Sequence, residues 1–305
     1  MSRALTMRLP VLLVTARHGP TRADGRAAST RALDLLAAAL GERAGSTSVS
    51  HTREISVAAA VIGSSASIGV DLEADRAADP RTGRFFLRDH ELAWLDTAAS
   101  RQAEHLRLWT VKEALFKSDP GNADSVMRSY ALADPAARAG YARREPGGAL
   151  FGYGSARLGG RHLSIAACLA GLRAGAGIPM EGSTMNTGTT ENTGITESTG
   201  ITANTGTTAN TGTVENPGTT GSAGTPDPEI TTEAVLGRIA ELLVVPASEL
   251  APQTPIRELV RESFMLVELV IDLQEEFGTY FSQEELREIG TIGELVALLQ
   301  ASPRS

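Results

Sequence analysis

A six-residue repeat interrupts the chain and separates two regions of ordinary composition. From Asn186 the sequence reads NTGTTE, NTGITE, STGITA, NTGTTA, NTGTVE and NPGTTG. A stacked β-solenoid would need a recurring apolar position to fill its interior, but only Ile195, Ile201 and Val214 are aliphatic here. Burial therefore cannot offset the entropy of ordering this stretch. We predict three parts: a front domain (1–178), a disordered Thr/Gly/Asn repeat linker (179–227) and a C-terminal domain (228–305).

The net charge of −8 is unevenly distributed between the two ends of the chain. Residues 1–178 carry 23 Arg and Lys against 17 Asp and Glu, whereas residues 179–305 carry 5 against 19. A basic front half suits a polyanionic ligand, and an acidic tail suits a basic partner. Two interpretations stay open: the two halves bind each other, or their compositions differ only because the domains are unrelated.

Several classes of protein are excluded at this point. The single cysteine, Cys168, rules out an internal disulfide framework and a Cys-based zinc site, and it fits a reducing compartment. No apolar run approaches the ~20 residues that span a bilayer, and Val11–Val14 is too short for a signal-peptide core. We expect a cytoplasmic chain that binds neither membrane nor nucleic acid.

Hydrophobic periodicity predicts an α+β front domain and an all-α four-helix bundle at the C terminus. The predicted front strands are Leu9–Val14, Ile55–Ile62, Ser67–Glu73, Ser129–Ala133, Leu150–Leu158 and His162–Leu169. The predicted front helices are Arg26–Leu40, Leu87–Asp96 and Gln102–Ser118. In the bundle, helices are predicted from Thr231/Thr232 to Val245, from Ser263 to Gly278, and over Gln283–Glu288 and Ile292–Leu299.

Two carboxylates lie two residues apart in IGVDLE. On a strand, Asp71 and Glu73 point to the same face. Each raises the cost of ionising the other unless a cation intervenes. Hard oxygen ligands in this arrangement suit Mg²⁺, which completes its shell with water and phosphate. The alternative interpretation is an exposed strand end, where acidic residues are common.

The helix RLWTVKEALFK buries an apolar face and places Glu113 and Lys117 together on the opposite face. An ordinary surface pair one turn apart would explain this spacing. However, the chain contains 26 Arg and only two Lys, and both lysines, Lys112 and Lys117, lie in this helix. An ammonium is a compact charge that can hold phosphate oxygens and transfer a proton, which a guanidinium does poorly. The composition therefore favours a functional site.

His51 and Ser263 are the remaining candidates. A lone histidine is more often structural, but His51 is flanked by Ser50 and Thr52 at a strand edge and can hydrogen-bond a phosphate there. Ser263 begins a predicted helix and can serve simply as its N-cap. That helix is unusually acidic, which makes Ser263 a natural docking and modification site. The acidic residues are Glu262, Glu268, Asp272, Glu275 and Glu276.

Taken together, these segments resemble two known families. The front domain resembles a 4′-phosphopantetheinyl transferase of the monomeric type, built from two pseudo-symmetric halves, through SVSH-T-x6-AAV, IGVDLE and, about forty residues on, WTVKEALFK. The C-terminal domain resembles an acyl or peptidyl carrier protein, with TPIRELVRESFMLVEL in register with that family's TPLxELGxDSLxxVEL. The resemblance covers the chain except the repeat linker.

The resemblance implies a role for each matched position. Three acids match the Mg²⁺ ligands: Asp71, Glu73 and Glu113. Glu113 is also the candidate base. Lys117 matches the lysine that contacts phosphate and assists the leaving group. His51 with Ser50 matches the segment that binds coenzyme A, and Lys112 lies beside Glu113 at a further matched position that we assign to coenzyme A. Ser263 matches the serine that carries the covalent phosphopantetheine arm.

The implied activity is that of an Mg²⁺-dependent transferase of the holo-acyl-carrier-protein synthase type. It would move the 4′-phosphopantetheine arm of coenzyme A onto a carrier serine, either Ser263 or that of a separate carrier, and release adenosine 3′,5′-bisphosphate. In the alternative, the chain is a carrier modified in trans, and its transferase-like domain is a non-catalytic docking scaffold. A third interpretation is an interaction module that is never modified. Polyketide or nonribosomal peptide synthases are the expected enzyme partners.

Two departures from the family patterns stand out. The front domain has about 175 residues, which is short for the monomeric type. The carrier motif reads Glu262-Ser263-Phe264 where Asp-Ser-Leu is usual. Glutamate keeps the charge on a longer side chain, and Phe264 is bulkier at a position that meets the enzyme. We expect this motif to affect how efficiently the serine is modified.

Overall fold

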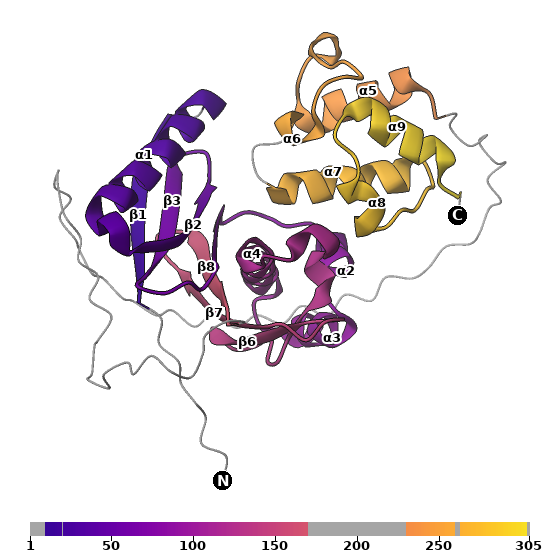
Figure 1. Cartoon of the computed structure of the whole chain (residues 1–305). Helices are drawn as coiled ribbons and strands as arrows, with labels where there is room; N and C mark the ends of the chain where they lie inside the picture. The colour runs from indigo at the N-terminus through magenta and orange to yellow at the C-terminus, as the bar shows by residue number, and fades with distance from the viewer. Residues whose placement is uncertain (1–9, 20, 170–229, 260–262, 304–305) are drawn as a thin grey trace, which may run out of the picture. The chain divides into compact units, whose positions relative to one another are not determined.

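The computed structural model of the chain describes residues 10–19, 21–169, 230–259 and 263–303 (Figure 1). Among these, residues 10–169 and 230–303 belong to one compact unit. The predicted linker over 179–227 lies outside the described residues. In the described ranges, no helix is both long enough and apolar enough to cross a membrane.

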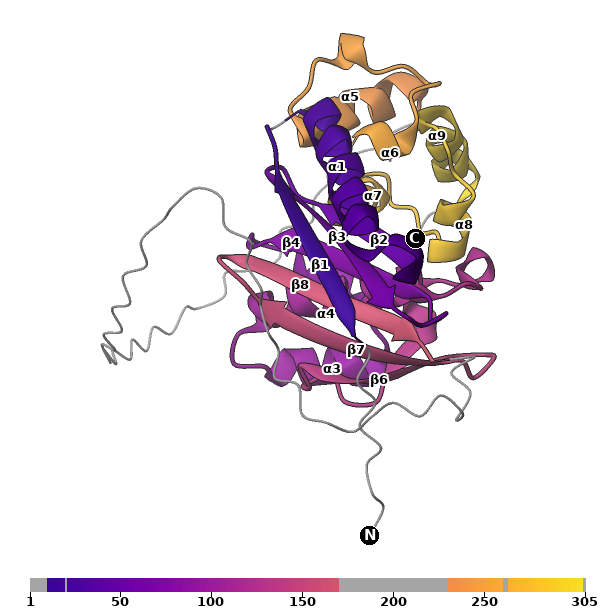
Figure 2. The ribbon, with the colours of Figure 1, turned by 60° about the vertical axis from the view of Figure 1, so that its left-hand side comes forward.

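The first half of the front region is a three-stranded antiparallel sheet covered by one long helix (Figure 2). The strands are β1 (Val11–Arg17), β2 (Ala44–His51) and β3 (Ile55–Ile62), in the order β1-β3-β2, and the helix is α1 (Arg22–Leu40). The Thr21 hydroxyl caps α1 by accepting from the Asp24 amide. Small residues let helix and sheet approach closely: Ala28 and Ala32 of α1 pack against Ala58 and Ala60 of β3.

The second half is a five-stranded antiparallel sheet with the order β4-β8-β7-β6-β5. Its strands are β4 (Ile68–Ala74), β5 (Tyr130–Leu132), β6 (Ala139–Arg144), β7 (Leu150–Arg157) and β8 (Arg161–Cys168). Its helices are α2 (Gly83–Phe86), α3 (Asp89–Thr97) and α4 (Arg101–Ser118). The sequence did not predict β2, β6 or α2 as elements; the other front elements match predicted ones to within a few residues.

The two sheets share an apolar layer because β3 and β4 are buried on both faces. Residues Val57, Ala59 and Val61 of β3 pack against Ile68 and Val70 of β4. Strict alternation then directs the other residues of β4 toward α4, which lies on the far face of the five-stranded sheet. This layering is what points the acids of β4 at the charged residues of α4.

A ladder of serine hydroxyls closes the open edge of β4. The backbone amides of Ile68, Val70 and Leu72 donate to the hydroxyls of Ser46, Ser48 and Ser50 on β2, at 3.3, 3.0 and 3.2 Å. Serine hydroxyls on one face of β2 therefore accept hydrogen bonds from the backbone amides at the edge of β4, although no strand pairs with β4 along this edge. The ladder fixes β2 to β4, and the last serine reaches the site.

The C-terminal region is a helical bundle. Its helices are α5 (Thr232–Leu243), α6 (Ile256–Leu259), α7 (Ser263–Glu276), α8 (Gln283–Arg287) and α9 (Ile292–Ala301). Thr231 caps α5, and capping boxes formed by Ser282 and Thr291 begin α8 and α9. The predicted bundle is confirmed, with the short α6 added between the first two predicted helices. The core lies between α5, α7 and α9.

Candidate functional site

Strand β4 presents Gly69, Asp71 and Glu73 to helix α4. Gly69 lies so close to the helix that a β-carbon built on it would fall 2.0 Å from the Ala114 carbonyl oxygen. Asp71 and Glu73 follow on the same face, and each is only 2% exposed. The predicted side-by-side carboxylates are therefore confirmed in position, but they are buried beside a helix and not at an exposed strand end.

Lys117 of α4 joins two of the predicted acids. Its Nζ lies 2.9 Å from Asp71 Oδ1 and 3.5 Å from Glu113 Oε1, with the lysine side chain 27% exposed. Burial by itself would lower the pKa of Lys117, but the negative charges of Asp71 and Glu113 outweigh it and raise the pKa above the ordinary lysine value. Lys117 is therefore a permanent cation at the open side of the site.

The donor set here is chemically suited to a hard cation. Ser50 donates to Asp71 Oδ1 at 2.9 Å, while Asp71 Oδ2 is buried without a hydrogen bond in the described part of the chain. A buried carboxylate oxygen in that state is costly unless a cation or water meets it. However, no group of three or more His, Cys, Asp or Glu side chains among the described residues is arranged to hold a metal. The Asp71, Glu73 and Glu113 set therefore stays a prediction.

Glu73 is connected to the aromatic interior of the front domain. The Trp109 indole Nε1 donates to Glu73 Oε1 at 3.2 Å. Trp109 is fully buried, and its ring also contacts Phe86, with ring centroids 5.1 Å apart and nearly perpendicular rings. The position of one predicted metal ligand is thus tied to a packed aromatic cluster.

Lys112 lies apart from these acids, in the interior. Its side chain is 0% exposed, and Nζ lies 2.6 Å from Glu91 Oε2 and also donates to the Tyr130 carbonyl. Burial lowers the pKa of Lys112 to about 8, despite the neighbouring Glu91. Glu91 also accepts from the Leu132 amide at 2.9 Å. This lysine forms a structural ion pair, so the predicted contact with coenzyme A does not fit its position. The hydroxyl of Ser50 is likewise already hydrogen-bonded, because it donates to Asp71 and accepts from the Leu72 amide.

Removing one partner of this buried pair should destabilise the front domain strongly. We expect Lys112→Met to lower its free energy of unfolding by about 3–5 kcal/mol, because Glu91 is left as an uncompensated buried charge. Arg128→Met, which breaks an exposed pair with Asp89, should cost about 1 kcal/mol or less. Both tryptophans of the chain lie in the front domain, so tryptophan fluorescence during urea titration follows the unfolding of this domain. Equal losses in the two variants would contradict the buried-pair interpretation.

His51 is exposed at the end of β2, and a second histidine lies near it. His51 Cδ2 and His18 Cε1 lie 3.6 and 3.5 Å from the point where a β-carbon on Gly25 of α1 would stand. The two imidazoles therefore flank one turn of α1. His18 was not singled out from the sequence, although it directly follows β1 in ARHGP.

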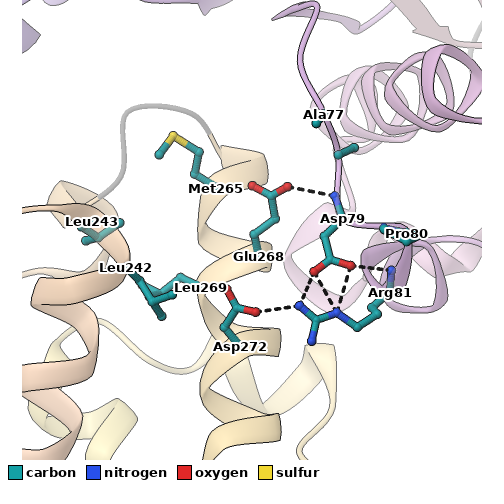
Figure 3. Close-up of a pocket in the computed structure, with 11 residues that line it drawn as sticks. Ala77, Asp79, Pro80, Arg81, Leu242, Leu243, Met265, Glu268, Leu269 and Asp272 are labelled. Atoms are coloured by element: carbon teal, nitrogen blue, oxygen red, sulfur yellow. Dashed lines mark hydrogen bonds and ion pairs between the residues drawn. The ribbon is translucent and has the colours of Figure 1, made fainter.

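Acidic residues of α7 form ion pairs with two arginines that follow β4, and Figure 3 shows the pair between Arg81 and Asp272. Arg76 Nη1 lies 2.7 Å from Glu268 Oε2, and Arg81 Nη2 lies 2.7 Å from Asp272 Oδ1. Arg81 also pairs with Glu275, and Glu268 accepts from the Asp79 amide at 3.2 Å. The interpretation that the basic and acidic halves bind each other is thus confirmed for these groups.

A pocket of about 470 Å³ opens beside these pairs (Figure 3). Its walls come from the end of α5, one side of α7 and the segment 77–81.

The sequence analysis did not identify Arg76 and Arg81 as functional candidates. The spacing of the acidic residues on α7 could have indicated them. Three acids lie about one turn apart on one side of this helix, which favours a basic partner: Glu268, Asp272 and Glu275. Ser263 begins α7, and its side chain lies outside the described residues.

These observations define a class: a transferase-like α+β domain joined to a carrier-like helical bundle. A family model described as "4'-phosphopantetheinyl transferase superfamily" matches residues 67–156, and one described as "Phosphopantetheine attachment site" matches residues 233–299. The acyl carrier protein of Helicobacter hepaticus is 36% identical over 73 residues, which cover 24% of this chain and 96% of that protein. The chain belongs to the acyl carrier protein family through its C-terminal domain, and it carries a phosphopantetheinyl transferase domain as well.

Proposed function

We propose that this chain transfers the 4′-phosphopantetheine arm of coenzyme A to a carrier serine, with Ser263 of its own carrier domain as an acceptor. Adenosine 3′,5′-bisphosphate is the other product. Glu113 and Lys117 are the catalytic residues, and Asp71, Glu73 and Glu113 hold Mg²⁺. We place the protein in the cytoplasm, with a monomeric transferase domain, where it serves polyketide or nonribosomal peptide synthases.

The observation that carries this proposal is the position of Trp109. Its indole donates to Glu73 at 3.2 Å, and its ring lies 4.7 Å from the ring of Phe264, centroid to centroid. Phe264 is the residue directly after Ser263. One fully buried side chain therefore connects the acceptor end of α7 with the acids of β4, which is the proximity that a transfer between the two domains needs.

Residues of the front domain supply the groups that phosphoryl transfer requires. Mg²⁺ on the three carboxylates would neutralise and orient the pyrophosphate of coenzyme A. The raised pKa of Lys117 keeps it protonated, which suits charge stabilisation of the leaving bisphosphate more than proton donation. His51, exposed beside His18, is suited to a phosphate of coenzyme A.

The proposed step balances as one displacement at phosphorus. The Ser263 hydroxyl oxygen forms a bond to the phosphorus that bears pantetheine, and its proton passes to the Glu113 carboxylate. The bond from that phosphorus to the bridging oxygen breaks. The electron pair stays on the departing bisphosphate, whose new charge faces the Lys117 ammonium.

A second candidate function is that of a docking scaffold, which would make the same contacts with the carrier but would not transfer the arm. The pairs of Arg76 and Arg81 with α7 are also what a docking scaffold would provide for a carrier that another enzyme modifies. The two candidates differ in what purified protein can do alone.

Intact mass separates the candidates. We expect the full chain, purified without its arm and given coenzyme A and Mg²⁺, to gain one phosphopantetheine, and Ser263→Ala to gain none. Gain by the wild-type chain only after an outside phosphopantetheinyl transferase is added would overturn the enzyme proposal and support the scaffold. No gain with either enzyme source would mean that the bundle is an unmodified interaction module.

A further inference from the structure

Phe264 of the carrier is buried among aromatic side chains of the transferase domain. Its exposed fraction is 0%. Its ring centroid lies 4.7 Å from that of Trp109, 5.8 Å from His105 and 6.3 Å from Phe86, the last two nearly perpendicular to it. Edge-to-face and tilted arrangements at these separations are the favourable ones for aromatic rings. We call Phe86, His105 and Trp109 the aromatic socket.

Contacts within the transferase domain hold the three side chains of the socket together. Phe86 and Trp109 are both fully buried and stack edge to face on each other. His105 is fixed by a 2.8 Å hydrogen bond between its Nε2 and the Thr82 hydroxyl, and burial lowers the pKa of His105 to about 4. The histidine is therefore neutral near pH 7 and offers an aromatic wall without a charge.

Helix α7 has two apolar faces, and only one belongs to the carrier bundle. Leu269, Val270 and Leu273 pack into the bundle core. Phe264, Val267 and Ile271 belong instead to the apolar cluster of the transferase domain. Val267 thus faces the transferase domain. The spacing of three and then four residues puts these side chains on one stripe of the helix.

The guanidinium of Arg76 lies over the Phe264 ring and adds a charged group to the contacts of the socket. Its guanidinium carbon lies 4.7 Å from the ring centroid of Phe264, within the range of a cation–π contact. The same guanidinium pairs with Glu268, one turn further along α7. A leucine at position 264 offers neither a π face to Arg76 nor a ring edge to the socket, and its smaller volume leaves space between the rings.

We propose that the aromatic socket is a specificity element that selects Phe264, so that the transferase prefers its own carrier to carriers with an aliphatic residue after the acceptor serine. This inference rests on the proposed function. It gives a direction to the expected effect of Phe264 on modification: aromatic rings of the transferase domain accommodate the bulk of this residue. Phe264 acts as a positioning residue, because it fixes the start of α7, where Ser263 lies.

The first test compares self-loading by the full chain with loading by an outside phosphopantetheinyl transferase. We expect Phe264→Leu to slow self-loading about tenfold, the size of a lost buried aromatic contact. The matched control is Phe277→Leu, because Phe277 packs only in the bundle cluster. Loading by the outside enzyme is measured in an Asp71→Asn background, in which the chain's own activity is silenced. There the two leucine variants should be loaded at similar rates.

A double-mutant cycle ties the effect to the socket itself. In a Phe86→Leu background, Phe264→Leu should slow self-loading less than threefold, because the partner ring is already gone. If Phe264→Leu self-loads as fast as the wild-type chain, or if the effects of the two substitutions simply multiply, the specificity inference is overturned and the transferase proposal stands. If the wild-type chain fails to load itself, both are overturned together.

Discussion

Asp71→Asn should lower the rate of arm transfer by about 100- to 1,000-fold, the usual loss when a charged group that stabilises the transition state is removed. Asparagine has the same shape as aspartate and keeps an oxygen that can accept from Ser50 and Lys117, so the fold is preserved. What disappears is the negative charge, together with the oxygen Oδ2 that is buried without a hydrogen bond in the described part of the chain. The rate is measured by intact mass over a range of Mg²⁺ concentrations.

The matched control is Asp75→Asn, just beyond the same strand. The Asp75 carboxylate pairs with Arg157 and His162, which are not among the predicted metal ligands. We expect this change to alter the transfer rate less than threefold. If Asp71→Asn and Asp75→Asn behave alike, or if Asp71→Asn needs no more Mg²⁺ than the wild-type chain, then Asp71 is not a ligand.

The segment IGVDLE could be interpreted from the sequence because side chains alternate between the two faces of a strand. Alternation alone puts Gly69, Asp71 and Glu73 on a common face, and the structure turns that face toward α4. Which partners would meet it could not be predicted, since Ser50 and Trp109 come from elements far away in the sequence. Strand β6 was missed for a related reason: AGYARR carries no clear alternation, and it is a strand because β5 and β7 pair with it.

Lys112 is correctly seen as unusual in the sequence, but its position in the structure fits an ion pair in the interior and not a contact with coenzyme A. Its rarity among the basic residues suggested a functional ammonium, and burial explains that rarity equally well. A clue was available, because Lys112 falls within the face of the helix that Leu108 and Leu115 define. Glu91, its partner, lies on α3 and could not be paired with it from spacing alone.

The docking contacts needed the structure most. The acidic stripe on α7 predicted a basic partner, but Arg76 and Arg81 were two among 26 arginines. Phe264 could be recognised only as a departure from a pattern. Its role became clear only from its contacts with Trp109 of α4 and Phe86 of α2, which lie far from it in the sequence.

Gly69→Ala should impair stability and transfer together, because it forces β4 and α4 apart. The new β-carbon would fall 2.0 Å from the Ala114 carbonyl oxygen and 2.7 Å from the Ser118 amide nitrogen. Both are backbone atoms, so no side-chain rotation can relieve the clash. Overpacking of this kind costs about 1–3 kcal/mol or more. Because α4 carries Lys117 and β4 carries its partner Asp71, a shift of about 1 Å can also slow transfer about 100-fold.

The same substitution at Gly237 should have the opposite sign. Gly237 lies inside α5, and a β-carbon there would meet nothing within 4 Å. Alanine is the better helix former, so Gly237→Ala should stabilise the bundle by about 0.5–1 kcal/mol. Hydrogen exchange of the full chain resolves both effects, as faster exchange in β4 and α4 and slower exchange in α5. Unchanged exchange and transfer in Gly69→Ala would mean that strand and helix lie further apart in solution, too far for Lys117 to reach Asp71.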